Sequence, residues 1–387
     1  MSFHRLNPLI PLIVTGSSLD MMDPHGILMG YDGYGIHSDS ASSPGYTLLL
    51  RDLGLAYDQL RGAPGTSVAW PSAAPQGYAG YARQEATARR SSDWTKAMEF
   101  WRQKLHPAPP QLTLPGAQRE LRETKQGQGA GNGNEISNDL NFTGSKVDFE
   151  LSQNLSEKLY ALSSRFGASI HATLLAAWMV LLSRYAEEDA EDVCVGTPFA
   201  CRTTAESEGT VGYFVTPLCI RAHVSGSFDA LLQQVYGEVQ SALRFQRVPL
   251  NEVCEELGLE QRHILQAMFV FQTCPEWGQE LPSFLMGHEG SELPLGSELQ
   301  LESMAIGQRH AQFDLALMMA FSPSQQLIGN FQYSFASYSR ETVLRLQSQY
   351  QRLLEKIVSD PEQNVTQIPF IDVKDLQLPR AISPWQD

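Results

Sequence analysis

The stretch YGIHSDSASSPG, at residues 34–45, holds a histidine close to aspartate and serine residues, side-chain types that can take part in acid–base chemistry. His37 is followed by Ser38 and Asp39. A neutral imidazole can accept a proton near pH 7, so His37 is a candidate general base. The plainer alternatives are a loop histidine at position 37 and a turn aspartate at position 39, because aspartate is common in turns.

Motifs for phosphate, metal and serine-nucleophile chemistry are missing from the sequence. It has neither GxGxxG nor GxxxxGKS/T, so no phosphate-binding loop is indicated. No two histidines stand at metal-ligand spacing on a predicted helix, and no GxSxG elbow occurs. We therefore expect no metal ion. His171 opens an apolar helix, where a histidine is usually a hydrogen-bonded part of the core.

Charge and composition exclude several classes of partner. Of the 387 residues, 42% are hydrophobic, enough to bury a core. The 43 acidic and 28 basic residues give a formal net charge of −15, which disfavours nucleic acid and anionic membranes. No apolar run is long enough to span a bilayer, and the first residues lack a strong positive flank. We expect a cytoplasmic protein that binds neither nucleic acid nor membranes.

The cysteines are dispersed through the second half of the chain. No two of them have CxxC spacing, and their number is odd, which favours reduced thiols over a disulfide framework or a zinc site. The five are Cys194, Cys201, Cys219, Cys254 and Cys274.

Hydrophobic periodicity predicts the elements that must position these residues. Residues 1–45 show no sustained period, and residues 116–140 are polar and glycine-rich, which is typical of a linker. Because the predicted helices and strands do not alternate strictly, we expect an α+β layered fold. Helices are predicted over 47–62, 91–105, 155–167, 169–186, 228–246 and 340–361, and strands over 146–152, 191–202, 211–224 (interrupted at Pro217), 267–273, 311–321 and 327–335.

Seven segments occur in an order that resembles the condensation domain of nonribosomal peptide synthetases. The resemblance covers roughly residues 46–372, and its strength lies in the co-occurrence of the segments. They are YAGYARQ (78–84), FWRQKLHPAPPQLTLP (100–115), VGTPFACR (195–202), VGYFVTPLCIR (211–221), FQRVPLNEV (245–253), LQAMFVFQ (265–272) and AQFDL (311–315).

The resemblance implies a two-lobed pseudo-dimer, similar to chloramphenicol acetyltransferase, with a tunnel between the lobes. The first lobe is expected to be incomplete. We divide the chain into an unpatterned segment (1–45), a first-lobe remnant with a glycine-rich linker (46–145) and a second lobe (146–387). No cofactor is expected to be bound. Substrates are expected on the phosphopantetheine arms of peptidyl or acyl carrier proteins, the implied partners.

The family's HHxxxDG signature falls on HSDSASS, residues 37–43, when it is placed by its usual distance from LLLRDL. His37 then takes the place of the first histidine and Ser38 that of the second, which the family uses as the catalytic base. Asp39 is a candidate replacement for the structural aspartate. A second placement puts Asp32 and Gly33 on the DG pair and leaves no histidine. Both placements predict a degenerate site.

Two further positions follow from the resemblance. Arg202 matches the arginine that holds the signature aspartate across the lobes; the alternative is a surface arginine at a strand end. Thr216 replaces the family's asparagine in VGxFVN and is predicted to line the tunnel.

Three functional hypotheses remain open. The first is a condensation-type acyltransferase of nonribosomal peptide or hybrid polyketide biosynthesis, a secondary-metabolite pathway, with its amide-forming reaction impaired. The second is a non-catalytic module that docks a carrier protein or a tailoring enzyme. The third is a gene fragment or a frame-shifted condensation domain, suggested by the change in patterning near Tyr46.

Overall fold

The computed structural model describes residues 43–61, 77–112, 143–186, 191–202, 204–274, 279–286, 292–295, 299–303 and 311–369. The predicted linker at 116–140 and most of the unpatterned segment at 1–45 lie outside these ranges. So do His37 and Asp39.

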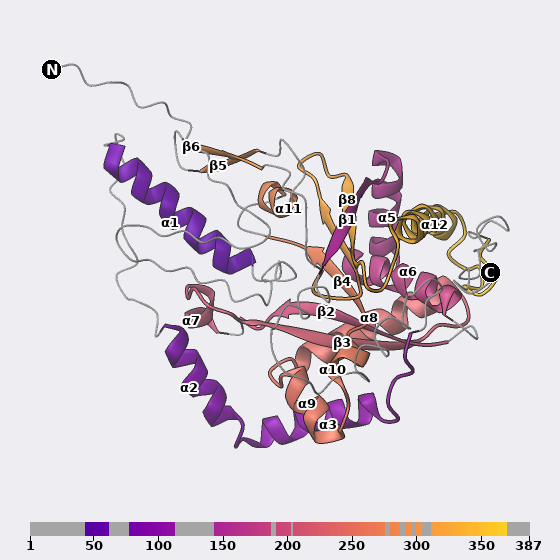
Figure 1. The fold of residues 1–387 in the computed structure, drawn as a ribbon, viewed down its shortest axis with the longest axis horizontal. Coiled ribbons are helices and arrows are strands. Elements are labelled where there is room, and N and C mark those ends of the chain that lie inside the picture. The colour runs from indigo at the N-terminus through magenta and orange to yellow at the C-terminus, as the bar shows by residue number, and fades with distance from the viewer. Residues whose placement is uncertain are drawn as a thin grey trace, which may run out of the picture.

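A six-stranded mixed sheet forms the centre of the fold (Figure 1). Its spatial order is β1-β8-β7-β4-β2-β3, with β4 parallel to both β2 and β7 and the other neighbours antiparallel. All six strands were predicted from their apolar patterning. The strands are β1 (Gly144–Glu150), β2 (Asp192–Ala200), β3 (Val215–His223), β4 (Ala267–Gln272), β7 (Leu315–Phe321) and β8 (Leu327–Ser334).

The edge strand β3 runs without interruption through Pro217, contrary to the predicted break. Pro217 stands opposite Pro198 of β2 in the register. Because neither proline has an N–H group, neither leaves a donor of its own unpaired at this step of the ladder.

Four amphipathic or apolar helices cover one face of the sheet, as Figure 1 shows. They are α5 (Gln153–Arg165), α6 (Ile170–Tyr185), α8 (Phe228–Arg244) and α12 (Arg340–Ser359). The predicted all-round apolar character of α6 is confirmed, since every residue from Ala172 to Ser183 is buried. Ser152, Ser169 and Ser339 cap α5, α6 and α12 by accepting a hydrogen bond from a first-turn N–H.

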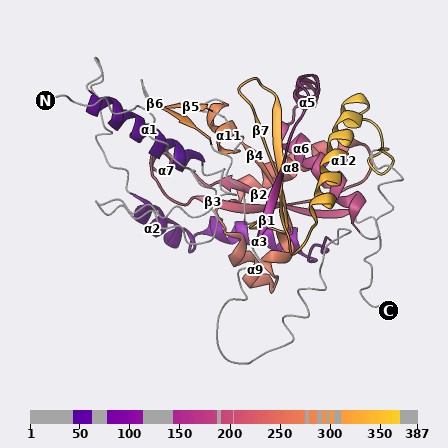
Figure 2. The same ribbon diagram turned by 45° about the horizontal axis from the view of Figure 1, so that its top comes forward.

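The opposite side of the sheet carries a further group of elements, which both views show together (Figures 1 and 2). They are α1 (Ser43–Arg61), α11 (Glu280–Leu285) and the two-stranded sheet of β5 (Glu292–Leu295) and β6 (Leu299–Glu302). The helix α1 contacts β5, and α11 contacts both β5 and β7. The sequence predicted α1 but not the other three, because each is six residues or shorter.

The remaining helices flank the β2–β3 edge. They are α2 (Tyr78–Ala88), α3 (Ser92–Leu105), α7 (Ala205–Glu208), α9 (Leu250–Leu257) and α10 (Gln261–Ile264). Trp101 of α3 is 2% exposed and donates from Nε1 to the carbonyl oxygen of Phe245, at 3.0 Å. Thus α3 shares the main hydrophobic core with the helices over the sheet.

The domain boundary between residues 145 and 146 stays a prediction.

The prediction that all five cysteines are reduced is wrong for two of them. Cys194 and Cys219 form a disulfide between β2 and β3, with their Cα atoms 6.4 Å apart. The register places Cys219 opposite Gly196, which makes Cys194 its diagonal neighbour on the same sheet face. The spacing in the sequence does not reveal this register. Cys201, Cys254 and Cys274 are buried free thiols.

No single helix in the described ranges has the length and apolarity to cross a membrane. The helices α5 and α6 pass that test only as a pair bent by 105°.

Candidate functional site

The described part of the predicted site consists of Arg202, Thr216 and the aromatic residues around them. His37, Ser38 and Asp39 lie outside the described residues, so their geometry relative to Arg202 stays a prediction. Within the described ranges, no group of His, Cys, Asp or Glu side chains could hold a metal ion.

Arg202 is a partly buried residue that organises the loop between β2 and β3. Its Nη1 donates to the carbonyl oxygens of Ser207 and Thr210, the latter at 2.7 Å. Its guanidinium lies over the ring of Phe214, 4.2 Å from the centroid. An arginine stacked on a ring and bonded to two carbonyls is fixed in orientation. Arg202 thus follows the end of β2 as a partly buried, hydrogen-bonded side chain, and its predicted role across the lobes stays a prediction.

Thr216 lies on β3 opposite Phe199 of β2 and is partly buried. By strand alternation its side chain shares the sheet face of Leu218 and Ile220, both of which belong to the main core. Its predicted role in lining a tunnel stays a prediction.

Two segments that are far apart in the sequence meet beside Arg202. The ring of Phe214 lies 4.6 Å from that of Tyr81 and 5.5 Å from that of Tyr78, both on α2. A Cβ atom on Gly212 would collide with the Tyr78 ring, so glycine permits this contact. The YAGYARQ and VGYFVTP segments thus form one aromatic cluster, which the sequence did not predict.

The phenol groups of this cluster stay protonated at physiological pH. Burial, with a smaller contribution from Glu85, raises the pKa of Tyr81 to about 12. The same two causes raise the pKa of the neighbouring Cys201 thiol to about 12. Both groups are therefore neutral, and neither is an activated nucleophile.

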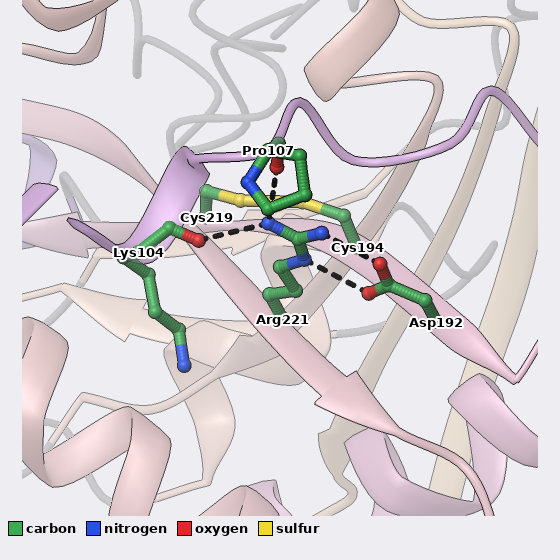
Figure 3. Close-up of polar contacts among 6 residues, drawn as sticks. All are labelled: Lys104, Pro107, Asp192, Cys194, Cys219 and Arg221. Atoms are coloured by element: carbon green, nitrogen blue, oxygen red, sulfur yellow. Dashed lines mark hydrogen bonds and ion pairs between the residues drawn. A yellow bond between two sulfur atoms is a disulfide. The ribbon is translucent and has the colours of Figure 1, made fainter. Parts of the chain in front are cut away.

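A second ordered site lies where α3 ends against the sheet. Figure 3 shows Arg221 at its centre. Its Nε and Nη2 donate to the two oxygens of Asp192, at 2.8 and 2.6 Å. Its Nη1 donates to the carbonyl oxygens of Lys104, at 3.0 Å, and Pro107, at 2.7 Å. The arginine of VGYFVTPLCIR thus fixes the chain that leaves α3 beside the Cys194–Cys219 disulfide.

His171 occupies the helix-covered side of the sheet. Its Nε2 lies 3.1 Å from the hydroxyl of Thr197, and its ring centroid lies 5.4 Å from that of Phe199 and 5.3 Å from that of Phe269. Burial lowers its pKa to about 4, so it is neutral at pH 7. This confirms the expectation of a hydrogen-bonded core histidine.

An open groove of about 880 Å³ lies between α3 and α9, with Trp94 and Met98 among its lining residues. Ion pairs join its two sides: Arg89 with Glu252 at 2.6 Å, and Arg102 with Glu256. Because these charged side chains pair with one another across the groove, we interpret the groove as the packing interface between the helices.

The chain matches the family model described as "Condensation domain" over residues 38–377. That range begins one residue after His37 and contains Arg202 and Thr216. Among curated proteins, one component of the linear gramicidin synthase of Brevibacillus parabrevis is 30% identical over 347 residues, which are 88% of this chain and 6% of that protein. One component of the plipastatin synthase of Bacillus subtilis (strain 168) is 25% identical over 296 residues, 76% of this chain and 7% of that protein.

Solved structures show the same fold at lower identity. The first condensation domain of the calcium-dependent antibiotic synthetase, in complex with substrate analogue 3a, superposes with a TM-score of 0.63 at 18% identity. It covers 85% of this chain and 64% of that chain. The complex of the X-domain and OxyB from teicoplanin biosynthesis gives a TM-score of 0.63 at 19% identity, covering 84% of this chain and 67% of that chain.

The chain therefore spans only a small part of the curated synthetases that it matches. The predicted α+β condensation-domain fold is confirmed by the solved structures. The family model covers far more than half of the sequence. On these grounds, the chain belongs to the condensation domain family.

Proposed function

We propose that this chain is a condensation unit of nonribosomal peptide biosynthesis, acting on acyl groups carried as thioesters on phosphopantetheine arms. The observation that carries the proposal is the match to the condensation domain model over residues 38–377. The ordered Arg202–Phe214–Tyr81 cluster supports it, since these residues lie in the segments that resemble the family's motifs.

The reaction proposed is amide formation. The amine nitrogen of an aminoacyl group attacks the thioester carbonyl carbon of the donor, and the C–N bond forms as the C–S bond breaks. The nitrogen loses a proton to a base, and the departing thiolate gains one. Holding both carrier arms in one site supplies the proximity that this step needs. Carrier proteins are thus the proposed partners, and no cofactor is required.

His37 is the proposed base, and the replacement of the second signature histidine by Ser38 is the proposed cause of a reduced rate. General acid–base catalysis contributes about 10²–10⁴-fold to such a step. The test mixes the purified chain with a loaded donor carrier and a loaded acceptor carrier, and detects amide product by mass spectrometry. His37→Ala should abolish the product that the unaltered chain makes. An unaffected variant removes His37 from the mechanism.

A docking role without turnover is the second candidate. Its support is the fold shared with an X-domain whose structure is a complex with OxyB. If this role holds, a loaded carrier or a tailoring enzyme binds in titration calorimetry while no amide product forms. Absence of binding to either counts against docking.

The extent of the first lobe in this chain stays our prediction. Sequencing the coding DNA upstream of Tyr46 and reading all three frames tests it. An intact HHxxxDG signature in another frame would assign residues 1–45 to a frame shift. A clean frame without that signature would support the degenerate site.

A further inference from the structure

Gln272, the last residue of β4, has a buried carboxamide side chain. It is 2% exposed. Neither its Nε2 nor its Oε1 has a hydrogen-bond partner among the residues that the structure describes. Leaving buried donors and acceptors unpaired costs folding free energy, so such a group in a native protein calls for an explanation, such as an ordered water or a bound ligand.

The side chain of Gln272 lies on the sheet face opposite the helices. Alternation along β4 places it on the same side as Val270. Val270 packs in a small cluster with Met318 and Ala320 of β7 and with Met286, which follows α11. Phe269, the residue before Val270, points to the other face of the sheet and packs in the main core with the helices.

Gln272 also lies at the junction between the sheet and α1. Two residues further along the chain, Cys274 is buried, with its Sγ 3.3 Å from the hydroxyl oxygen of Thr47 on α1. This contact joins residues 227 positions apart. The helix α1 belongs to the predicted first-lobe remnant and β4 to the predicted second lobe, so Gln272 lies near a contact between these two parts of the chain.

A second unpaired group lies on the same face. Asn330 of β8 is 1% exposed, and its Oδ1 has no partner in the described part of the chain. The register places Ile328 beside Ala320 and Ala320 beside Gln272. Asn330 is thus two strands and two residues away, about 12 Å between Cα atoms at ordinary sheet spacing.

A buried glutamine on the helix side shows the contrast. Gln349 of α12 is 0% exposed, and its Oε1 accepts a hydrogen bond from the hydroxyl of Tyr185. This buried carboxamide oxygen is therefore satisfied within the fold, although Trp178 Nε1 and the Tyr333 hydroxyl of the same core have no partner among the described residues. Gln272 and Asn330, whose carboxamide oxygens have no partner in the described ranges, lie on the opposite face of the sheet.

We propose that the carboxamide of Gln272 binds a secondary amide of the carrier-bound substrate. Its Nε2 donates to the carbonyl oxygen of that amide, and its Oε1 accepts the N–H. A carboxamide and a secondary amide are complementary because each offers both a donor and an acceptor. The inference rests on the proposed function, and it makes Gln272 a positioning residue. Both the phosphopantetheine arm and an N-acylated donor chain contain such amides.

The first test replaces Gln272 by methionine, which keeps the length of the side chain and removes both polar atoms. Gln272→Met should lower kcat/KM for amide formation at least tenfold, with a melting temperature equal to or above that of the unaltered protein. The matched control is Gln349→Met, which should lower the melting temperature and leave kcat/KM of the folded protein unchanged. A Gln272→Met variant with kcat/KM within twofold of the unaltered protein would assign the unpaired atoms to ordered water and overturn the proposal.

The second test needs neither turnover nor a stable variant. The side-chain NH₂ signals of Gln272 are followed by ¹⁵N NMR during titration with D-pantetheine or with N-acetylalanine methylamide. A saturable shift with one probe supports the proposal and identifies the arm or the donor chain as the source of the amide. No shift with either probe overturns it. If the unaltered protein makes no amide product yet shows the shift, the proposed function fails while the inference stands.

Discussion

The two faces of the central sheet differ in the kinds of side chain that pack on them. On the helix-covered face, Phe331 is fully buried against Trp178 and Tyr350, with ring centroids 5.6 and 6.2 Å away. The hydroxyl of Tyr350 donates to the carbonyl oxygen of Leu174 at 2.9 Å, which joins α12 to α6. This face is a close-packed core whose purpose is stability.

The opposite face mixes apolar and polar side chains. Lys146 pairs with Asp148 at 3.0 Å and donates to the carbonyl oxygen of Met286 at 3.2 Å. Gln272 and Asn330 lie among the methionine and aliphatic side chains of the same face. The helices α1 and α11 and the β5–β6 sheet lie on this side, and the hydrophobic clusters there are small beside the main core. The difference is that one face carries the large aromatic core, while the other carries smaller clusters with buried polar side chains among them.

The largest expected effect on stability comes from truncating a core side chain on the helix-covered face. Phe331→Ala removes a ring that is 0% exposed and leaves a cavity between β8, α6 and α12. Such truncations cost about 3–5 kcal/mol of unfolding free energy. The measurement is urea unfolding followed by circular dichroism. Phe335→Ala, at a side chain that is 51% exposed, is the matched control, with an expected change within about 0.5 kcal/mol. Equal losses in the two variants would contradict the assignment of the core.

Acidic pH should lower the stability of the helix-covered core through protonation of His171. Its pKa is about 4 in the folded protein, against an ordinary value of 6.5. Between these values the unfolded chain binds a proton that the folded protein does not, so stability is lost as pH falls through this window. The loss approaches about 3 kcal/mol near pH 4. Unfolding free energies of the unaltered protein and His171→Gln, measured from pH 7 to pH 4, should differ in slope. Parallel curves would show that His171 does not contribute.

A smaller effect is expected where the polar contacts at the end of α3 are removed. Arg221→Ala deletes four hydrogen bonds, to Asp192, Lys104 and Pro107. Because hydrogen bonds of charged groups each contribute modestly to stability, we expect a loss of about 2 kcal/mol in urea unfolding. Arg221→Lys should recover less than half of it, since lysine lacks the planar fork.

The control for Arg221 is Arg51→Ala, which removes an exposed ion pair with Asp52. Exposed pairs contribute between about 0 and 1 kcal/mol, so this variant should remain close to the unaltered protein. An Arg221→Ala variant no weaker than Arg51→Ala would show that the end of α3 is held by packing alone.

Local patterning predicted most of the elements but not the shortest ones. The predicted helix at 91–105 matches α3, and its Ser91 cap accepts from the N–H of Trp94 at 3.2 Å. The helix α11 and the strands β5 and β6 have at most six residues each, too few to show a period. They form through contacts with α1 and β7.

The candidate site was predictable only in its parts. The sequence placed Arg202 and Thr216 in segments that resemble family motifs, and Arg202 proved to be an ordered residue. It did not predict that Tyr81 would contact Phe214, because the two are separated by 132 intervening residues (82–213). His37 and Asp39, outside the described residues, remain predictions.

The sequence by itself determined the α+β class, the family and the order of the main elements, because periodicity and motif spacing are written along the chain. Only the tertiary structure decided strand register, which paired Cys194 with Cys219 and set Pro217 opposite Pro198. It also decided which face of β4 the helices cover, and hence that the carboxamide of Gln272 lies on the other face, with no hydrogen-bond partner in the part of the chain that the structure describes. These outcomes depend on pairing between distant segments, which is fixed by the packing of the whole fold rather than by any local pattern.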